Sequence, residues 1–344
     1  MNQNQNPKQK HAKKVRTWLR LFLLLFIMGT GISGISLPSA PSRAVLTAQA
    51  ASSVPGLSAK ITKNNVLKLL KKYDTSGYYI LKKQVSYGDN ILSWFSGSST
   101  ILAGIDTAVH EETHSYSFTQ KKGYDVAYYV GNKKTIYVNY TKVYSSYKMA
   151  SSIPSRLRTD RYSLYVAGSD NTLSSNTRGI YGLLNEFMAY GTGMNTTVSL
   201  YDYLMDQDSD WTSWRVFINQ CENDMLAYSE FKYFMLHYLY YAKKNYPTVY
   251  KGIVNNKQFC KAYKKLESSF KKQIKQYLKL LNTLPAYFAE KGYTLTITDE
   301  SVMLSTGSSS IGLGRFYEDY LALQAELSKS RYTKLHKKLL QGAK

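Results

Sequence analysis

Two histidines and a glutamate stand close together in the segment HEETH, residues 110–114. On an α-helix, positions i and i+4 lie one above the other, so His110 and His114 would direct both imidazoles toward one point. Paired imidazoles suit zinc, which accepts nitrogen ligands in a tetrahedral shell. Glu111 is one step around the helix, where its carboxylate can reach a water beside the ion without binding the ion. The spacing therefore predicts a metal site with an adjacent base.

A catalytic zinc site needs a third protein ligand and an open position. HEETH does not continue as H-x-x-G-x-x-H, because Ser117 and Gln120 occupy the positions of the required glycine and histidine. Glu186, in the apolar segment GLLNEFMAYG, is the only acid between Asp170 and Asp202. An unpaired carboxylate is costly to bury, so the pattern favours Glu186 as the third ligand. The alternative is that it points to solvent at the edge of its helix.

Together, HEETH and NEFMAY resemble the two motifs of the gluzincin zinc metallopeptidases, the thermolysin-like class. In that family H-E-x-x-H is followed by N-E-x-x-x-D on a neighbouring helix. The resemblance implies a zincin-like catalytic region whose zinc ligands are His110, His114 and Glu186. It also implies that Glu111 acts as the general base, and Asn185 matches the asparagine before the ligand glutamate. The resemblance is confined to these two short segments.

Two features depart from the family's pattern. Glu186 follows His114 by 72 positions, which is longer than in thermolysin-like enzymes and implies an insertion. Tyr190 stands where the family has an acid that orients a ligand histidine. Asp106, one helical turn before His110, is a candidate substitute for that acid. The Tyr190 hydroxyl is a candidate donor to the oxyanion of the tetrahedral intermediate, and packing in the core or at the surface is its alternative role.

The segments that would carry these residues have apolar side chains at helical spacing. They predict helices over 64–74, 96–118 and 176–191, with Gly191 and Gly193 ending the last one. HEETH and Glu186 would then lie on two different helices, which must pack together to form one site.

The residues between and around these helices predict little regular structure. Strand-like runs within 124–140 flank Gly131-Asn132 and predict a β-hairpin. Residues 77–95 are expected to be short strands or loops, and 145–178 to be irregular surface. His237, further along the chain, lies in an aromatic-rich segment and is expected to be a core or boundary residue.

Beyond residue 205 the pattern is almost wholly helical and basic. Apolar residues recur at spacings of three and four from Phe259 to Leu281, with lysines between them, as in an amphipathic helix. The lysine face is either solvated or a surface that binds a wall or membrane. An extended piece over 293–304 precedes a last helix over about 316–340. GSSSIGLGRF lacks the lysine of a phosphate-binding loop.

These elements predict a mainly α protein with a small β region (α+β). The expected parts are a signal peptide over 1–50, a flexible leader over 51–62, a zincin-like catalytic region with a hairpin insertion over 63–205, and a helical basic region over 206–344. Residues 1–50 combine a basic start, an apolar run and Ala48-Gln49-Ala50, which predicts a cleaved secretory signal. An uncleaved membrane anchor is the alternative.

The charge of the chain favours anionic partners. Residues 1–50 contain seven basic residues and no acid, so their removal lowers the net charge from +22 to +15. An anionic cell wall or membrane surface suits this charge, whereas no nucleic-acid-binding motif accompanies it. A basic composition is also common among secreted proteins of Gram-positive bacteria, and we expect a secreted or cell-surface protein of such a bacterium. The chain has two cysteines, Cys221 and Cys260, and one disulfide bond between them is possible outside the cytoplasm.

The sequence therefore predicts a secreted zinc-dependent metallopeptidase that acts on proteins or peptides. Zinc would lower the pKa of a bound water, and Glu111 would accept its proton and later protonate the leaving amine. The alternative is a basic cell-envelope-binding protein whose zinc site is structural or inactive. Glu111 separates the two functions, because a structural site needs the three ligands and has no use for a neighbouring base.

Overall fold

The computed structural model describes residues 54–168 and 173–344. The predicted signal peptide lies outside these residues, as do the first three residues of the predicted leader. Residues 54–62 contain no helix or strand and lead into the helix that begins at Lys63. Among the described residues, no helix combines the length and apolarity needed to cross a bilayer.

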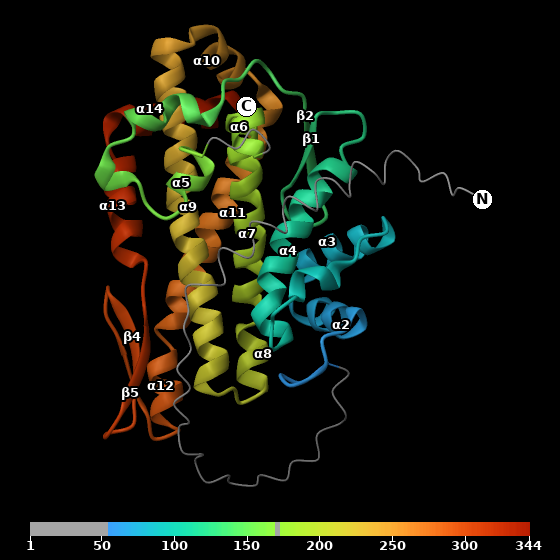
Figure 1. The fold of residues 1–344 in the computed structure, drawn as a ribbon, viewed down its shortest axis with the longest axis vertical. Coiled ribbons are helices and arrows are strands. Elements are labelled where there is room, and N and C mark those ends of the chain that lie inside the picture. The colour runs from blue at the N-terminus through green and yellow to red at the C-terminus, as the bar shows by residue number, and fades with distance from the viewer. Residues whose placement is uncertain (1–53, 169–172) are drawn as a thin grey trace, which may run out of the picture. The chain divides into compact units, whose positions relative to one another are not determined.

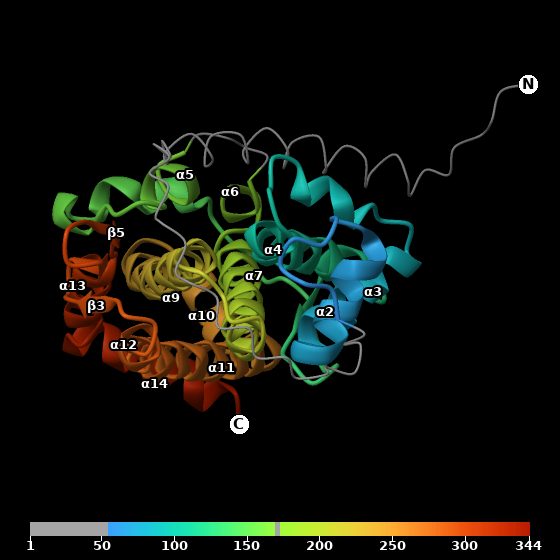
Figure 2. The same cartoon turned by 90° about the horizontal axis from the view of Figure 1, so that it is seen from below.

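The described part of the chain is mainly helical, with two small antiparallel sheets (Figure 1). The prediction of a mainly α protein with a small β region is therefore confirmed. Its centre is α7 (Ile180–Ser199), which packs against α4 (Ile101–Thr119), α9 (Trp211–Asn245) and α11 (Lys257–Leu281). Figure 2 shows α4 and α9 on either side of α7. The helices predicted over 96–118 and 176–191 to carry the site correspond to α4 and α7, which are thus direct neighbours.

Shorter helices surround this centre. The other α-helices are α2 (Lys63–Tyr73), α3 (Thr75–Ser86), α5 (Tyr162–Tyr165), α6 (Ser174–Arg178), α8 (Tyr201–Asp206), α10 (Pro247–Val254), α12 (Leu284–Ala289), α13 (Tyr317–Leu327) and α14 (Ser330–Gly342). The 3₁₀ helices of the described residues are η2 (Ile91–Phe95), η3 (Ser146–Ser152) and η4 (Ser155–Leu157).

Side-chain caps fix where the long helices begin. Thr100 Oγ1 accepts a hydrogen bond from the Ala103 amide at the start of α4 (3.2 Å), and Asp210 accepts one from Ser213 at the start of α9 (2.9 Å). Such caps satisfy amides that have no partner within the helix. α7 begins instead after Gly179, whose φ of 53° is one that residues with a side chain rarely adopt.

The predicted hairpin is present next to α4. β1 (Val126–Tyr129) pairs antiparallel with β2 (Thr135–Val138). The turn is closed by a hydrogen bond from the Lys134 amide to the Gly131 carbonyl oxygen (2.9 Å). Asn132 and Lys133 occupy its two central positions with φ of 49° and 59°, so the turn lies one residue later than the predicted Gly-Asn pair.

A second sheet follows α12. β3 (Thr294–Ile297), β4 (Ser301–Ser305) and β5 (Ser310–Gly314) form an antiparallel meander, which confirms the extended piece predicted over 293–304. The GSSSIGLGRF segment supplies β5. The single helix predicted over 316–340 is two helices, α13 and α14, because Lys329 between them has extended backbone angles.

Two further predictions of local structure, for 77–95 and for the end of α7, are wrong. The region 77–95 begins with α3, which Asp74 caps by accepting hydrogen bonds from the amides of Ser76 and Gly77 (both 3.0 Å). α3 buries Ile80 and Leu81 in the core, so packing overrides the β preference of its tyrosines. α7 does not end at the glycines near residue 191 but continues to Ser199.

The prediction of irregular surface over 145–178 is also wrong, because its described residues include the short helices η3, η4, α5 and α6 and many of them are buried. Met149, Ile153 and Leu157 are fully buried, and Arg161 is 1 % exposed. The prediction for α11 is confirmed, because its apolar stripe is buried: Phe259, Tyr263, Leu266, Phe270, Ile274, Tyr277 and Leu281.

The two thiols and one histidine lie in the core. Cys221 and Cys260 are buried and free, so the disulfide bond that the sequence allowed between them is not formed. His237 is 4 % exposed and hydrogen-bonds to Ser152 and Tyr332 (2.9 Å each), as expected of a core histidine.

Candidate metal site

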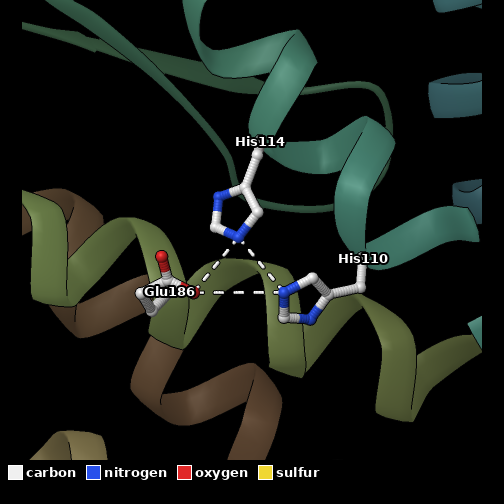
Figure 3. A group of neighbouring side chains, drawn as sticks. All are labelled: His110, His114 and Glu186. Atoms are coloured by element: carbon white, nitrogen blue, oxygen red, sulfur yellow. Dashed lines mark hydrogen bonds and ion pairs between the residues drawn. The ribbon is translucent and has the colours of Figure 1, made fainter. Parts of the chain in front are cut away.

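His110, His114 and Glu186 come together where α4 packs on α7 (Figure 3). His114 Nε2 lies 3.1 Å from His110 Nε2 and 3.2 Å from Glu186 Oε2. The distance between His110 Nε2 and Glu186 Oε2 is 4.0 Å. The three side chains are only 8–12 % exposed. Two imidazole nitrogens and a carboxylate oxygen thus converge, and this metal group could hold a metal ion.

The metal group contains a buried carboxylate oxygen whose neighbour is an imidazole nitrogen. Glu186 Oε2 lies 3.2 Å from His114 Nε2, which can donate to it only when that nitrogen carries a proton, and Glu111 Oε2 is buried with no hydrogen-bond partner among the described residues. A buried carboxylate oxygen in this condition is costly unless a cation or a proton compensates it. The position of Glu186 therefore fits a residue that accepts a cation, and not one that points to solvent.

Asn185 fixes the orientation of the His114 ring. Ser117 Oγ donates its hydrogen to the Thr113 carbonyl oxygen (3.1 Å), so it accepts the hydrogen bond from Asn185 Nδ2 (2.7 Å). Asn185 Oδ1 then accepts from His114 Nδ1 (2.6 Å). The proton is held on Nδ1, and Nε2 of His114 is directed toward Glu186.

Asp106 does not orient His114. It hydrogen-bonds to Thr197 of α7, and a side chain at Gly193 would collide with its Oδ1 atom. Burial raises the pKa of Asp106 to about 7. Asn185, and not Asp106, therefore orients this ligand histidine. Asn185 belongs to the family motif, but the sequence alone did not predict its contact with His114.

Glu111 lies close enough to interact electrostatically with two members of the metal group. It is 8 % exposed, and burial raises its pKa to about 7. The charge of His114 opposes this rise, and that of Glu186 adds to it. A carboxylate with a pKa near neutrality can both accept and return a proton at physiological pH.

The two histidines differ in protonation. Burial lowers the pKa of His110 well below its ordinary value, so its ring is neutral. Burial also opposes protonation of His114, but Glu186, Glu111 and Asn185 together outweigh it and raise the pKa of His114 to about 9. Without a metal ion, a proton on His114 Nε2 would neutralise Glu186. A proton and a metal ion therefore compete for the same nitrogen.

Tyr190 lies beside the metal group, on the same helix as Glu186. Its ring centroid is 4.4 Å from that of His110, with the planes at 77°. Burial raises the pKa of Tyr190 to about 12, so its hydroxyl keeps its hydrogen at neutral pH. Tyr165, on α5, hydrogen-bonds to Tyr190 and interacts electrostatically with Glu186.

The guanidinium group of a buried arginine packs against the ring of Tyr190. The Arg161 guanidinium carbon is 4.6 Å from the Tyr190 ring centroid. Arg161 is held by Glu230 of α9 (Nη1 to Oε2, 2.7 Å) and by Asn223 Oδ1 (2.6 Å). Sequence reasoning missed this residue, because Arg161 lies among other arginines of a polar segment and nothing local distinguishes it from Arg156.

No family model, curated protein or solved structure matches the chain. The chemistry of the metal group is therefore inferred from its own residues.

Proposed function

We propose that this chain is a zinc-dependent metallopeptidase that hydrolyses peptide bonds, with His110, His114 and Glu186 as zinc ligands and Glu111 as the base. The observation that carries the proposal is the convergence of these side chains from two helices. Chance would not be expected to place the lone acid of α7 against both histidines of HEETH.

The distances support zinc. Two ligand atoms at about 2.0–2.1 Å from one tetrahedral ion lie roughly 3.3 Å apart. The separations of 3.1, 3.2 and 4.0 Å lie close to this value, so one ion could be bound with small side-chain movements. Two imidazoles, one carboxylate and a fourth position open to water or substrate form a donor set typical of catalytic zinc.

Zinc, when bound, would polarise the attacking water and the carbonyl group of the substrate. Glu111 accepts a proton as the water oxygen bonds to the carbonyl carbon. The carbon–nitrogen bond then breaks, and Glu111 returns the proton to the leaving amine. Tyr190, protonated at neutral pH, is positioned beside His110 to donate a hydrogen bond to the oxyanion.

The proposal extends to location and partners. The basic and apolar start of the chain supports secretion, and the net charge of +15 without residues 1–50 supports an anionic wall or membrane surface as the setting. Proteins, peptides or wall cross-links are the proposed substrates.

A second candidate is a cell-envelope-binding protein with a structural zinc ion. It is favoured by the low exposure of the metal group, since ligands that are 8–12 % exposed leave little room for a substrate. This candidate gives Glu111 no role in function.

Replacing Glu111 by glutamine separates the two candidates. We expect Glu111→Gln to keep its zinc and lose at least about a hundredfold in hydrolysis of casein or purified peptidoglycan, because the proton acceptor is gone. His114→Ala should lose both zinc and hydrolysis. Glu112→Gln is the matched control: Glu112 neighbours Glu111 but accepts from Trp94 Nε1 (2.8 Å), and this variant should keep both. Wild-type hydrolysis by Glu111→Gln would contradict the peptidase proposal.

A further inference from the structure

A cavity of about 220 Å³ lies on a different face of α4 from the metal group. Its walls come from α3, the end of α4 and the β1–β2 hairpin, which pack together (Figure 1). Tyr116 follows His114 by two positions, which turns its side chain by about 200° around the helix. The cavity is therefore separate from the group that would hold zinc.

The lining of this cavity is cationic. Lys83, Lys122 and Lys133 line it, and none of its lining residues is acidic. The ammonium groups of Lys83 and Lys122 lie 5.8 Å from the Tyr79 ring centroid and 5.4 Å from the Tyr137 ring centroid, so tyrosines flank the cations. All three lysines are exposed, and an anion in the cavity would be attracted by all three charges.

The wall of the cavity also offers a hydroxyl hydrogen. The Tyr116 hydroxyl and Thr135 Oγ1 are 2.8 Å apart, and Tyr79 also hydrogen-bonds to Tyr116. Three hydroxyls carry three hydrogens, and the two bonds between them use two. The remaining hydrogen can be donated to a bound oxygen, as an oxyanion requires.

Two of the three lysines are held in a backbone conformation that favours glycine. Lys133 has φ of 59° in the hairpin turn, and Lys122 has φ of 50° in the turn that the Tyr124 amide closes on the Lys121 carbonyl oxygen (2.9 Å). A side chain in this region is destabilising relative to glycine. Such backbone conformations cluster at functional sites, and both of these lysine side chains line the same cavity.

We propose that this cavity, which we term the lysine cavity, is a binding site for a tetrahedral oxyanion of the phosphate class, either free or as the headgroup of an anionic lipid. Lys83, Lys122 and Lys133 supply the charge, and the one spare hydrogen of the Tyr79, Tyr116 and Thr135 hydroxyls supplies a directional hydrogen bond. The site requires no zinc and is independent of the proposed peptidase activity.

The test exploits the strained turns. In the double variant Lys122→Gly/Lys133→Gly, glycine suits both backbone conformations, so the thermal midpoint should be no lower than that of the wild type. Inorganic phosphate, titrated by calorimetry at constant ionic strength, should bind the variant at least about tenfold more weakly. Lys121→Gln/Lys134→Gln is the matched control. It removes the same charge from the same two turns outside the cavity, and phosphate binding should be unchanged.

Two results would overturn the proposal. One is the absence of saturable phosphate binding to the wild-type chain, and the other is equal weakening in both double variants, which would show only a general charge effect. A second arm identifies the source of the oxyanion. If the cavity binds a lipid headgroup, Lys122→Gly/Lys133→Gly should also lose sedimentation with phosphatidylglycerol vesicles relative to phosphatidylcholine vesicles. If it binds free phosphate, vesicle sedimentation should not change.

Discussion

The amide of Asn185 determines which nitrogen of His114 faces Glu186. Because Asn185 Oδ1 accepts from Nδ1 at 2.6 Å, a neutral His114 presents a lone pair on Nε2 toward the metal group. In metal sites, such a partner fixes the ring and increases its basicity. The chain Ser117–Asn185–His114 therefore prepares the site before an ion arrives.

Removing this partner should weaken metal binding. We expect Asn185→Ala to lower zinc affinity by about 10–100-fold, because the His114 ring loses the acceptor that holds it. Competition with a chromophoric chelator measures this directly. Asn195→Ala is the control: Asn195 lies on the same helix but donates to Asp74 (2.9 Å), and its loss should leave zinc affinity unchanged. Equal affinities in both variants and the wild type would contradict a positioning role for Asn185.

At the scale of elements, the metal group depends on how closely α7 approaches its neighbours. Gly191 faces Phe270 of α11, and a side chain at Gly193 would collide with Asp106 of α4. These glycines are places of close packing within the helix, and they do not end it. A glycine that ends a helix and a glycine that allows close packing inside a helix look the same in the sequence. The predicted end of α7 was wrong for this reason.

The Gly193→Ala variant tests this packing, because close packing predicts a lower free energy of unfolding where alanine would ordinarily raise it. Within a helix, alanine ordinarily stabilises relative to glycine by about 1 kcal/mol. Here the added methyl group would push α4 from α7, and we expect unfolding by urea to show a loss of about 1–3 kcal/mol together with weaker zinc binding. Gly252→Ala in α10, where the new Cβ would lie 3.2 Å from the Thr141 side chain, should change stability little. A more stable Gly193→Ala protein would contradict the packing role.

Elements with a strong apolar period could be predicted from the sequence, and residues defined by distant contacts could not. α11 was predicted well because it buries one regular apolar stripe, whereas α4 is buried on several faces and begins at Ile101, five residues after its predicted start. The convergence of Glu186 with the two histidines was predicted because its motif is local and it is the only acid nearby. Arg161 was missed because its burial depends on Glu230, which lies 69 positions away on another helix. α3 was missed because its helix is stabilised by packing and by the Asp74 cap.

At the scale of the whole described unit, both predicted regions contribute to the surroundings of the site. The candidate ligands lie before residue 205, but the helix that holds Arg161 lies after it. Glu230 and Asn223 of α9 position the guanidinium under Tyr190, and Tyr190 packs against His110. The helical region beyond residue 205 is therefore part of the support of the metal group.

The metal content of the purified chain tests the central claim most directly. The account predicts about one zinc ion per wild-type chain by elemental analysis, lost on dialysis against a chelator and restored by added zinc. Glu186→Ala, which removes only the carboxylate from α7, should retain far less. A folded wild-type chain that binds no more zinc than Glu186→Ala would contradict the account, because His110, His114 and Glu186 would then share a proton and not a metal ion.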